Sequence, residues 1–224
     1  VRVANNHTNI IYMARDGLVL KELPVTGNAE DHLQDKSVLN VKDIITFAET
    51  IPIDVIRPTV GRQIEKNTAI AAEGLRNSWG ANIGSTLLQG GTDWATQARA
   101  WAAAGSDARM NGCALPVAIV CGSGNQGITC ALPVMEYAEY LRCDHERLVR
   151  AVMLSDLIAV HIKSYIGARS AVCGAICAAC GAGAAITWLC GGTREQIGAT
   201  VSNTLGNVGG IVCDGAKASC AAKI

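Results

Sequence analysis

Apolar and polar residues alternate along the first part of the chain, and farther on the apolar residues recur at helical spacing. Alternation over residues 1–3 and 8–13, a turn at Asp16-Gly17 and an apolar run at residues 18–20 predict a β-hairpin. A helix is expected over residues 41–49, before Pro52, followed by a short segment at residues 54–56 that Pro58 ends. From about Val60 onward, Ala-rich helical patterning replaces the strand signals.

Two later helices carry signals at their ends. Asp144 is a suitable N-cap, Glu146 suits the positive end of the helix dipole, and apolar stripes continue to Tyr165. Thr193 is expected to cap a further helix that runs to the break at Gly209-Gly210. The pattern therefore predicts an α+β, mainly helical protein. A short strand-containing portion over residues 1–60 precedes an Ala- and Gly-rich helical domain over residues 61–224.

Composition narrows the class of protein. Half of the 224 residues are hydrophobic, which is enough for a sizeable core. Nineteen Lys and Arg balance nineteen Asp and Glu without a basic run, so nucleic-acid binding is disfavoured. Residues 171–189 are uncharged, but they are rich in Ala, Gly and Cys, which favours a buried helix over a membrane helix. Ala-rich helices are compatible with a homo-oligomer, although no specific interface is indicated.

Ten cysteines without a secretory leader favour a reducing cytoplasm over a disulfide framework. Several of them lie among apolar residues and are interpreted as small buried hydrophobes, namely Cys143, Cys177, Cys180 and Cys190. The chain does not begin with Met and is expected to be a piece of a longer protein.

Cys213 and Cys220 form the clearest candidate for a metal site. They are seven positions apart, with Gly215 between them to let the backbone turn, so one loop could direct two thiolates at one metal. Cys173, about forty positions upstream, is considered with them as a third thiol. Two unrelated cysteines remain the alternative, and a zinc site would favour a closer pair.

A Gly-rich segment at residues 122–128 lies between an apolar run and a helix-like run. Its backbone N–H groups, with the side chains of Ser123, Asn125 and Gln126, could bind an anion such as a carboxylate. It lacks the lysine of a Walker loop and the βαβ unit of a dinucleotide site. A tight structural turn is the alternative.

Residues 106–113 bring charge into an apolar neighbourhood. Asp107 and Arg109 are interpreted as a surface pair or a partly buried salt bridge, and Arg109 is alternatively a group that grips a substrate carboxylate. His7 stands at the entry to a predicted strand, where a lone histidine is more typically structural.

Several of these segments together resemble a known family. These segments closely resemble the L-cysteine desulfidase family and, more distantly, the α part of iron–sulfur L-serine dehydratases. They are residues 7–10, 79–84, 105–108, 122–129, 170–173 and 213–220. The motifs occur in the same order along nearly the whole chain.

The resemblance implies a [4Fe–4S] enzyme that performs β-elimination on a small amino acid. Cys173, Cys213 and Cys220 would be the cluster ligands, leaving one iron without a protein ligand to act as a Lewis acid. The segment of Ser123, Asn125 and Gln126 would line the substrate pocket, with Arg109 and His7 as further substrate-binding candidates. The products would be pyruvate, ammonia and either sulfide from L-cysteine or water from L-serine.

The resemblance also places the base, a cysteine in a Gly-Cys-Thr-Glu-Pro segment, upstream of residue 1, since residues 1–50 contain no match. Residues 112–116 echo that segment and make Cys113 a secondary candidate. L-Cysteine desulfidase is the leading hypothesis. The alternatives are L-serine dehydratase, an inactive truncated fragment with an empty metal site, and a zinc protein.

Overall fold

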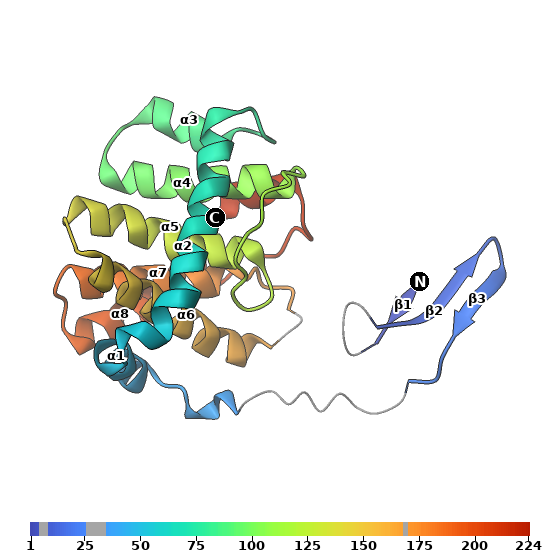
Figure 1. Cartoon of the computed structure of the whole chain (residues 1–224), viewed down its shortest axis with the longest axis horizontal. Coiled ribbons are helices and arrows are strands. Elements are labelled where there is room, and N and C mark those ends of the chain that lie inside the picture. Colours follow the sequence, from blue (N-terminus) through green and yellow to red (C-terminus); the bar gives the residue numbers. More distant parts are fainter. Residues whose placement is uncertain (5–8, 26–34, 168–169) are drawn as a thin grey trace. The chain divides into compact units, whose positions relative to one another are not determined.

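A computed structural model describes residues 1–4, 9–25, 35–167 and 170–224 of the chain. The chain divides into two compact units, Val1–Val38 and Leu39–Ile224 (Figure 1). The boundary expected at residue 60 falls inside the helix α2 (Ile53–Arg76) of the second unit. The candidate His7 lies outside the described residues.

The first unit contains a three-stranded antiparallel sheet in the order β1 (Arg2–Val3), β2 (Ile10–Arg15), β3 (Leu18–Glu22). Asp16 and Gly17 join β2 to β3, with φ angles of 51° and 83°. Two consecutive positive φ angles suit the tight turns that match the twist of a hairpin. The predicted hairpin is therefore confirmed. A 3-10 helix, η1 (Lys36–Val38), follows it in the chain.

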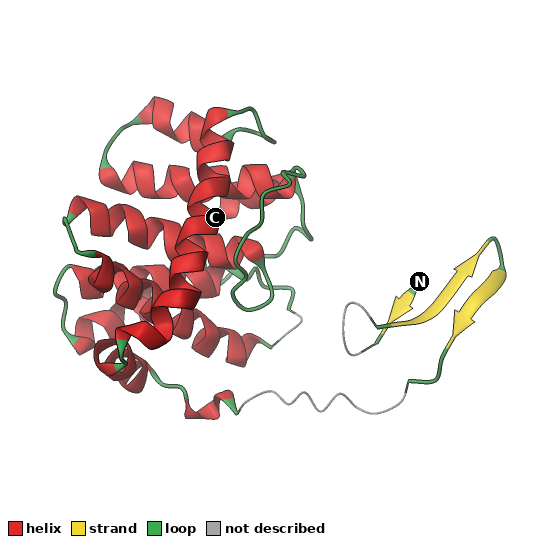
Figure 2. Cartoon of the chain, viewed as in Figure 1, coloured by secondary structure: helices red, strands yellow, loops and turns green. Residues whose placement is uncertain are grey.

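The second unit is helical throughout its described elements (Figure 2). In chain order these are α1 (Val41–Thr50), α2, α3 (Ile83–Gly90), α4 (Trp94–Met110), α5 (Gly124–Tyr140), α6 (His145–Ile166), α7 (Ala175–Leu189), α8 (Arg194–Val208) and the 3-10 helix η2 (Ala218–Lys223). With the sheet of the first unit, these helices confirm the α+β, mainly helical class.

Local signals located three of these helices correctly. The side chain of Asp144 accepts a 2.7 Å hydrogen bond from the N–H of Arg147 at the start of α6. Thr193 and Gln196 form a capping box at the start of α8, each accepting from the backbone N–H of the other. Helix α1 begins after Asn40, whose side chain accepts from the N–H of Asp43. These caps satisfy N–H groups that have no partner within their helices.

The prediction that Pro58 ends a short segment is wrong. Helix α2 begins at Ile53 and continues through Pro58 to Arg76. A proline near the start of a helix removes one backbone hydrogen bond, here to the carbonyl of Asp54. The loss is offset by a long buried stripe at helical spacing, made of Ile56, Val60, Gln63, Asn67, Ile70, Ala71 and Gly74.

Helix α7 packs against α5, α6 and α8, and ten of its fifteen residues are buried while none is exposed. Its small side chains include Cys177 and Cys180, both fully buried as predicted. Cys143 is partly buried against the same core, whereas Cys190 is exposed because it lies just beyond the end of α7, so that prediction is wrong for Cys190. Among the described residues, no helix combines the length and apolar content that crossing a bilayer requires.

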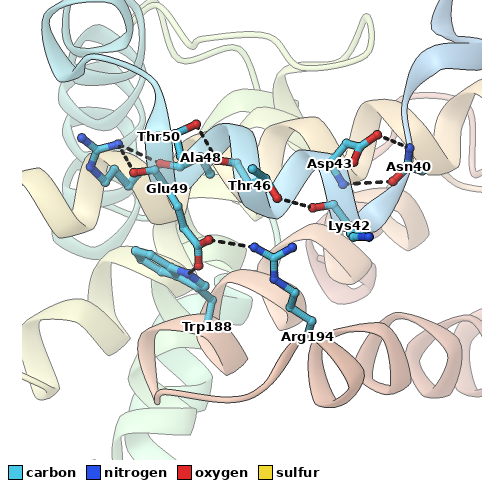
Figure 3. Close-up of polar contacts among 10 residues, drawn as sticks. Asn40, Lys42, Asp43, Thr46, Ala48, Glu49, Thr50, Trp188 and Arg194 are labelled. Carbon is cyan, nitrogen blue, oxygen red and sulfur yellow. Dashed lines mark hydrogen bonds and ion pairs between the residues drawn. The ribbon is translucent and has the colours of Figure 1, made fainter.

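The C-terminal end of α1 makes polar contacts with α6, α7 and α8, and Figure 3 shows those of Glu49. The Glu49 carboxylate accepts hydrogen bonds from the indole of Trp188 and the guanidinium of Arg194, both at 3.2 Å. Arg150 of α6 donates to the carbonyls of Ala48 at 2.8 Å and Ile51 at 3.0 Å. These bonds satisfy carbonyl groups that the end of α1 leaves without a helical partner.

A polar cluster joins α2, α5 and α6 inside the second unit. The Gln63 amide donates to the Asp156 carboxylate at 2.9 Å and to the carbonyl of Gly127 at 3.4 Å. Burial raises the pKa of Asp156 to about 7, although hydrogen bonds from Gln63 and Cys130 act in the opposite direction. The cluster therefore fixes the first turn of α5 to α2 and holds a carboxyl group that retains its proton more tightly than in water.

We expect Gly181→Ala in α7 to lower the free energy of unfolding by about 1–3 kcal/mol, because an added methyl group overpacks the core. A Cβ atom at this position would lie 2.2 Å from the carbonyl oxygen of Ser155 on α6. The matched control is Gly198→Ala in α8, where a Cβ would meet no atom within 4 Å. That control should gain about 0.5–1 kcal/mol from its helix propensity. Urea unfolding measures both, and equal effects would contradict the close approach of α6 and α7.

The Asp156 carboxyl should make stability fall as pH rises. Its pKa in the folded state, about 7, lies above its ordinary value of 3.8, so the folded state binds this proton more tightly than the unfolded state. The resulting stabilisation is present below the ordinary pKa and is lost as pH rises through about 7. Between about pH 5 and about pH 8, the wild type should lose thermal stability relative to Asp156→Asn. Parallel melting-temperature curves would contradict the assignment.

Candidate functional site

A cavity of about 420 Å³ opens where the starts of α5 and α7 meet the C-terminal segment. Seven of the residues singled out from the sequence line it, namely Arg109, Ser123, Asn125, Gln126, Cys173, Cys213 and Cys220. They come from segments that are far apart in the chain. The fold therefore gathers the thiol set and the polar set around one space.

A short backbone bridge holds two of the thiols side by side. Val172 and Val212 form an isolated antiparallel bridge between the segment before α7 and the segment after α8. The N–H of Cys173 donates to the carbonyl of Ile211 at 2.9 Å, and the N–H of Cys213 donates to the carbonyl of Ala171 at 2.8 Å. Main-chain bonds, which do not depend on any side chain, thus place Cys173 beside Cys213.

Cys220 reaches the same cavity from η2, which packs against α4. The backbone turns between Cys213 and Cys220 at Gly215, with φ 71°, and Ala216, with φ 64°. This confirms the turn predicted at Gly215, since positive φ favours glycine. Burial raises the pKa of the Cys173 thiol, and the neighbouring Cys213 and Cys220 add to the increase.

The donor set suits a cluster better than a single ion. Four thiols line one cavity, those of Cys121, Cys173, Cys213 and Cys220, and none of the described lining residues has a carboxylate side chain. Within the described ranges, no three His, Cys, Asp or Glu side chains converge closely enough to hold one metal ion. In an iron–sulfur cluster, each thiolate binds a different iron, so the thiolates need not converge on one point as zinc ligands do.

The polar part of the cavity is built around the start of α5. Gly122 and Ser123 are loop residues, but residues 124–128 belong to the helix, so the Gly-rich segment is only partly a loop. The side-chain oxygen of Asn125 accepts a 3.0 Å hydrogen bond from Arg109. Gln126 is 5% exposed, and the oxygen of its side-chain amide has no hydrogen-bond partner. A buried acceptor without a partner is costly, which makes it available to a bound molecule.

The proposed pairing of Asp107 with Arg109 is wrong. Asp107 is 1% exposed and accepts a 3.2 Å hydrogen bond from the N–H of Gly84, in the first turn of α3. Burial raises the pKa of this carboxyl group, against backbone hydrogen bonds that lower it. Arg109 instead donates to Asn125 and to the sulfur of Met110. The two side chains therefore have separate partners, and Arg109 is directed to the cavity.

Cys113 lies outside the cavity lining. It follows α4 and packs, partly buried, against a small apolar cluster that includes Ile128 and Leu132. This environment is that of a small hydrophobic side chain.

The sequence did not single out several residues that line the cavity, among them Lys163, Met110 and Ile224. Lys163 lies in the last turn of α6, where a basic residue is common because it complements the helix dipole. In the sequence, only its position shortly before the family motif that begins at Ser170 could have drawn attention to Lys163. With Arg109, Lys163 gives two cationic side chains among the described lining residues.

Comparison with known proteins gives a family. Residues 12–224 match the model of the serine dehydratase alpha chain family. A UPF0597 protein of Lachnoclostridium phytofermentans is 54% identical over 225 residues, which cover 100% of this chain and 54% of that protein. One from Desulfitobacterium hafniense is 47% identical, covering 100% of this chain and 52% of its own length.

A UPF0597 protein of Fusobacterium nucleatum is 45% identical over 231 residues, again 100% of this chain and 54% of the relative. The chain thus spans about half the length of the curated relatives it matches. No solved structure matches it significantly. Because the family model covers all but the first eleven residues, the chain belongs to the serine dehydratase alpha chain family.

Proposed function

We propose that the intact protein containing this chain is an iron–sulfur lyase that removes the β-substituent from L-cysteine. The observation that supports this most directly is the shared cavity, which is lined by the thiols of Cys173, Cys213 and Cys220 and by a guanidinium–amide pair. Such a space suits a small amino acid bound beside a cluster. Membership of the serine dehydratase alpha chain family supports the same class of reaction.

Cys173, Cys213 and Cys220 would hold a [4Fe–4S] cluster through their thiolates. Bound there, the cluster supplies an iron without a protein ligand, a Lewis acid for the departing group. The backbone bridge between Val172 and Val212 fixes the first two thiols. All ten cysteines are described, and no disulfide joins any of them.

Arg109 and the start of α5 would bind the substrate carboxylate. Asn125 orients the guanidinium by accepting one of its N–H groups, which leaves other N–H groups for a forked contact. The Ser123 hydroxyl makes no capping bond and lines the cavity, so it can donate to the same carboxylate. The unpaired side-chain amide oxygen of Gln126 would accept a hydrogen bond from the substrate ammonium group.

The elimination removes the proton from Cα while the Cβ–S bond breaks and its electron pair leaves with sulfur. The aminoacrylate that remains tautomerises to an imine, and water converts the imine to pyruvate and ammonia. We assign the proton acceptor to a segment preceding residue 1, as the resemblance to the desulfidases implies. Cys113, outside the cavity lining, is not used in this scheme.

L-Serine dehydratase is the second candidate, because the family model that matches is that of the serine dehydratase alpha chain. The same cavity would serve either substrate, since a thiol and a hydroxyl leaving group differ little in size. Anaerobic reconstitution of the intact protein with iron and sulfide, followed by assays with L-cysteine and L-serine, tests the choice. Cluster-dependent sulfide release above the rate of serine turnover supports L-cysteine, and the reverse supports L-serine.

Replacing Cys213 with Ala should abolish the visible absorption of the reconstituted cluster together with pyruvate formation, because one of three ligands is lost. Cys190→Ala is the matched control, since Cys190 is exposed and is absent from the cavity lining. It should retain both properties. If the Cys213 variant keeps its colour and turnover, the ligand assignment is wrong, and absence of any cluster in the wild type favours an inactive fragment or a zinc protein.

Replacing Asn125 with Ala should leave the cluster intact and raise KM about tenfold, equivalent to about 1.4 kcal/mol of lost binding. The physical reason is that Arg109 loses the acceptor that orients it. Ser123→Ala should raise KM in the same direction through loss of a hydroxyl donor. Steady-state kinetics normalised to iron content measure the effect. Unchanged KM in both variants would mean that the start of α5 is merely structural.

A further inference from the structure

The loop that carries Cys213 and Cys220 is closed by side chains that have no part in the scheme above. The two oxygens of the Asp214 carboxylate bind different residues. One accepts from the hydroxyl of Ser219 at 2.7 Å, and the other accepts from the ammonium of Lys223 at 2.5 Å. Lys223 also donates to the carbonyl of Val212 at 2.7 Å. These four residues are called the Asp214 clamp below.

From this geometry we propose that Asp214 is a positioning residue that sets the spacing of Cys213 and Cys220 for cluster binding. The inference rests on the proposed function. Asp214 directly follows the first thiol, Ser219 directly precedes the second, and Lys223 lies one turn beyond it. The Asp214 carboxylate, next to one cysteine, therefore binds side chains that lie on both sides of the other cysteine in the sequence.

The clamp also reaches the third thiol through the main chain. Val212, whose carbonyl accepts from Lys223, is the residue that forms the bridge with Val172. Val172 precedes Cys173, so one ammonium group connects η2 to the bridge that holds Cys173 beside Cys213. All three thiol-bearing segments are thus connected by a single chain of hydrogen bonds.

The loop needs such a connection because its own backbone holds it weakly. It contains two left-handed residues, Gly215 and Ala216, and η2 is a single short 3-10 helix. A short 3-10 helix has poor hydrogen-bond geometry. Without the clamp, Cys220 would be ordered mainly by packing of η2 on α4. Because a cluster must bind all three thiolates together, a preordered loop avoids the entropy cost of ordering it at that moment.

Asp214 acts through other residues and does not touch the substrate. Cys213, Ala216 and Cys220 line the cavity, but Asp214 and Lys223 do not. Lys223 lies close enough to Cys173 and Cys220 to interact with their charges. An ammonium behind the thiols offsets part of the negative charge that three thiolates bring together. The clamp is therefore a support behind the ligands.

The test compares Asp214→Ala and Asp214→Asn with wild type in the intact protein. Two quantities are measured: hydrogen–deuterium exchange over residues 211–224 before reconstitution, and the rate of iron loss to a chelator afterwards. We expect Asp214→Ala to exchange faster in this segment alone and to lose iron about tenfold faster. Asp214→Asn keeps an acceptor for Ser219 but loses the negative charge, so its iron loss should be intermediate.

The matched control is Asp54→Ala, which removes an exposed carboxylate in the first turn of α2. It should behave as wild type in both measurements. If wild type holds a cluster and both Asp214 variants lose iron at the wild-type rate, the positioning role of Asp214 is overturned while the proposed function stands. If wild type binds no cluster in any preparation, the proposed function fails and this role of Asp214 fails with it. Faster exchange throughout the second unit would mean general unfolding and would also overturn the positioning role.

Discussion

The close approach of helices around α7 is the constraint on which the rest of the second unit depends. Helix α7 consists mostly of Ala, Gly and Cys, so α5, α6 and α8 can all pack against it at short range. A side chain at Gly181 would collide with the backbone of α6, and one at Gly174 would lie 2.3 Å from the amide nitrogen of Gln126. The second contact brings the starts of α5 and α7 together, and the cavity opens there. The packing of small residues thus determines where polar groups can meet thiols.

The site itself is assembled by long-range backbone contacts, which explains which parts of it the sequence could predict. Turn and cap chemistry is local, so Asp16-Gly17, Asp144 and Thr193 located a hairpin and two helix starts correctly. The spacing of Cys213 and Cys220 and the composition of the Gly-rich segment made both of them candidates, but the assignment of Cys173 as a third ligand came from resemblance to a family, because no local rule relates Cys173 to Cys213. Their meeting depends on the bridge between Val172 and Val212, which joins segments separated by two helices.

The wrong and missed predictions also arise from long-range contacts. Pro58 is a sound local signal for a helix end, but the tertiary packing of the α2 stripe outweighs one lost hydrogen bond. Asp107 and Arg109 are close in sequence and opposite in charge, yet each finds a better partner on another element: the first turn of α3 for one and Asn125 for the other. Lys163 resembles any basic residue at a helix end, and only the fold reveals that it lines the cavity. Partners distant in sequence therefore decide each case.

The distribution of groups around the cavity has a chemical consequence for the substrate. Helices α4 and α5 supply the guanidinium of Arg109 and the amides of Asn125 and Gln126, whereas the segment before α7 and the C-terminal segment supply Cys173, Cys213 and Cys220. The fourth lining thiol, Cys121, precedes α5. An amino acid with a β-substituent has a similar division, since its carboxylate and its leaving group are at opposite ends. A carboxylate held by Arg109 would direct the β-carbon away from α5. With no carboxylate side chain among the described lining residues, an anionic substrate meets only cationic and neutral side chains and the thiols themselves. Under the proposed function, recognition of the carboxylate and activation of the leaving group would therefore depend on different structural elements.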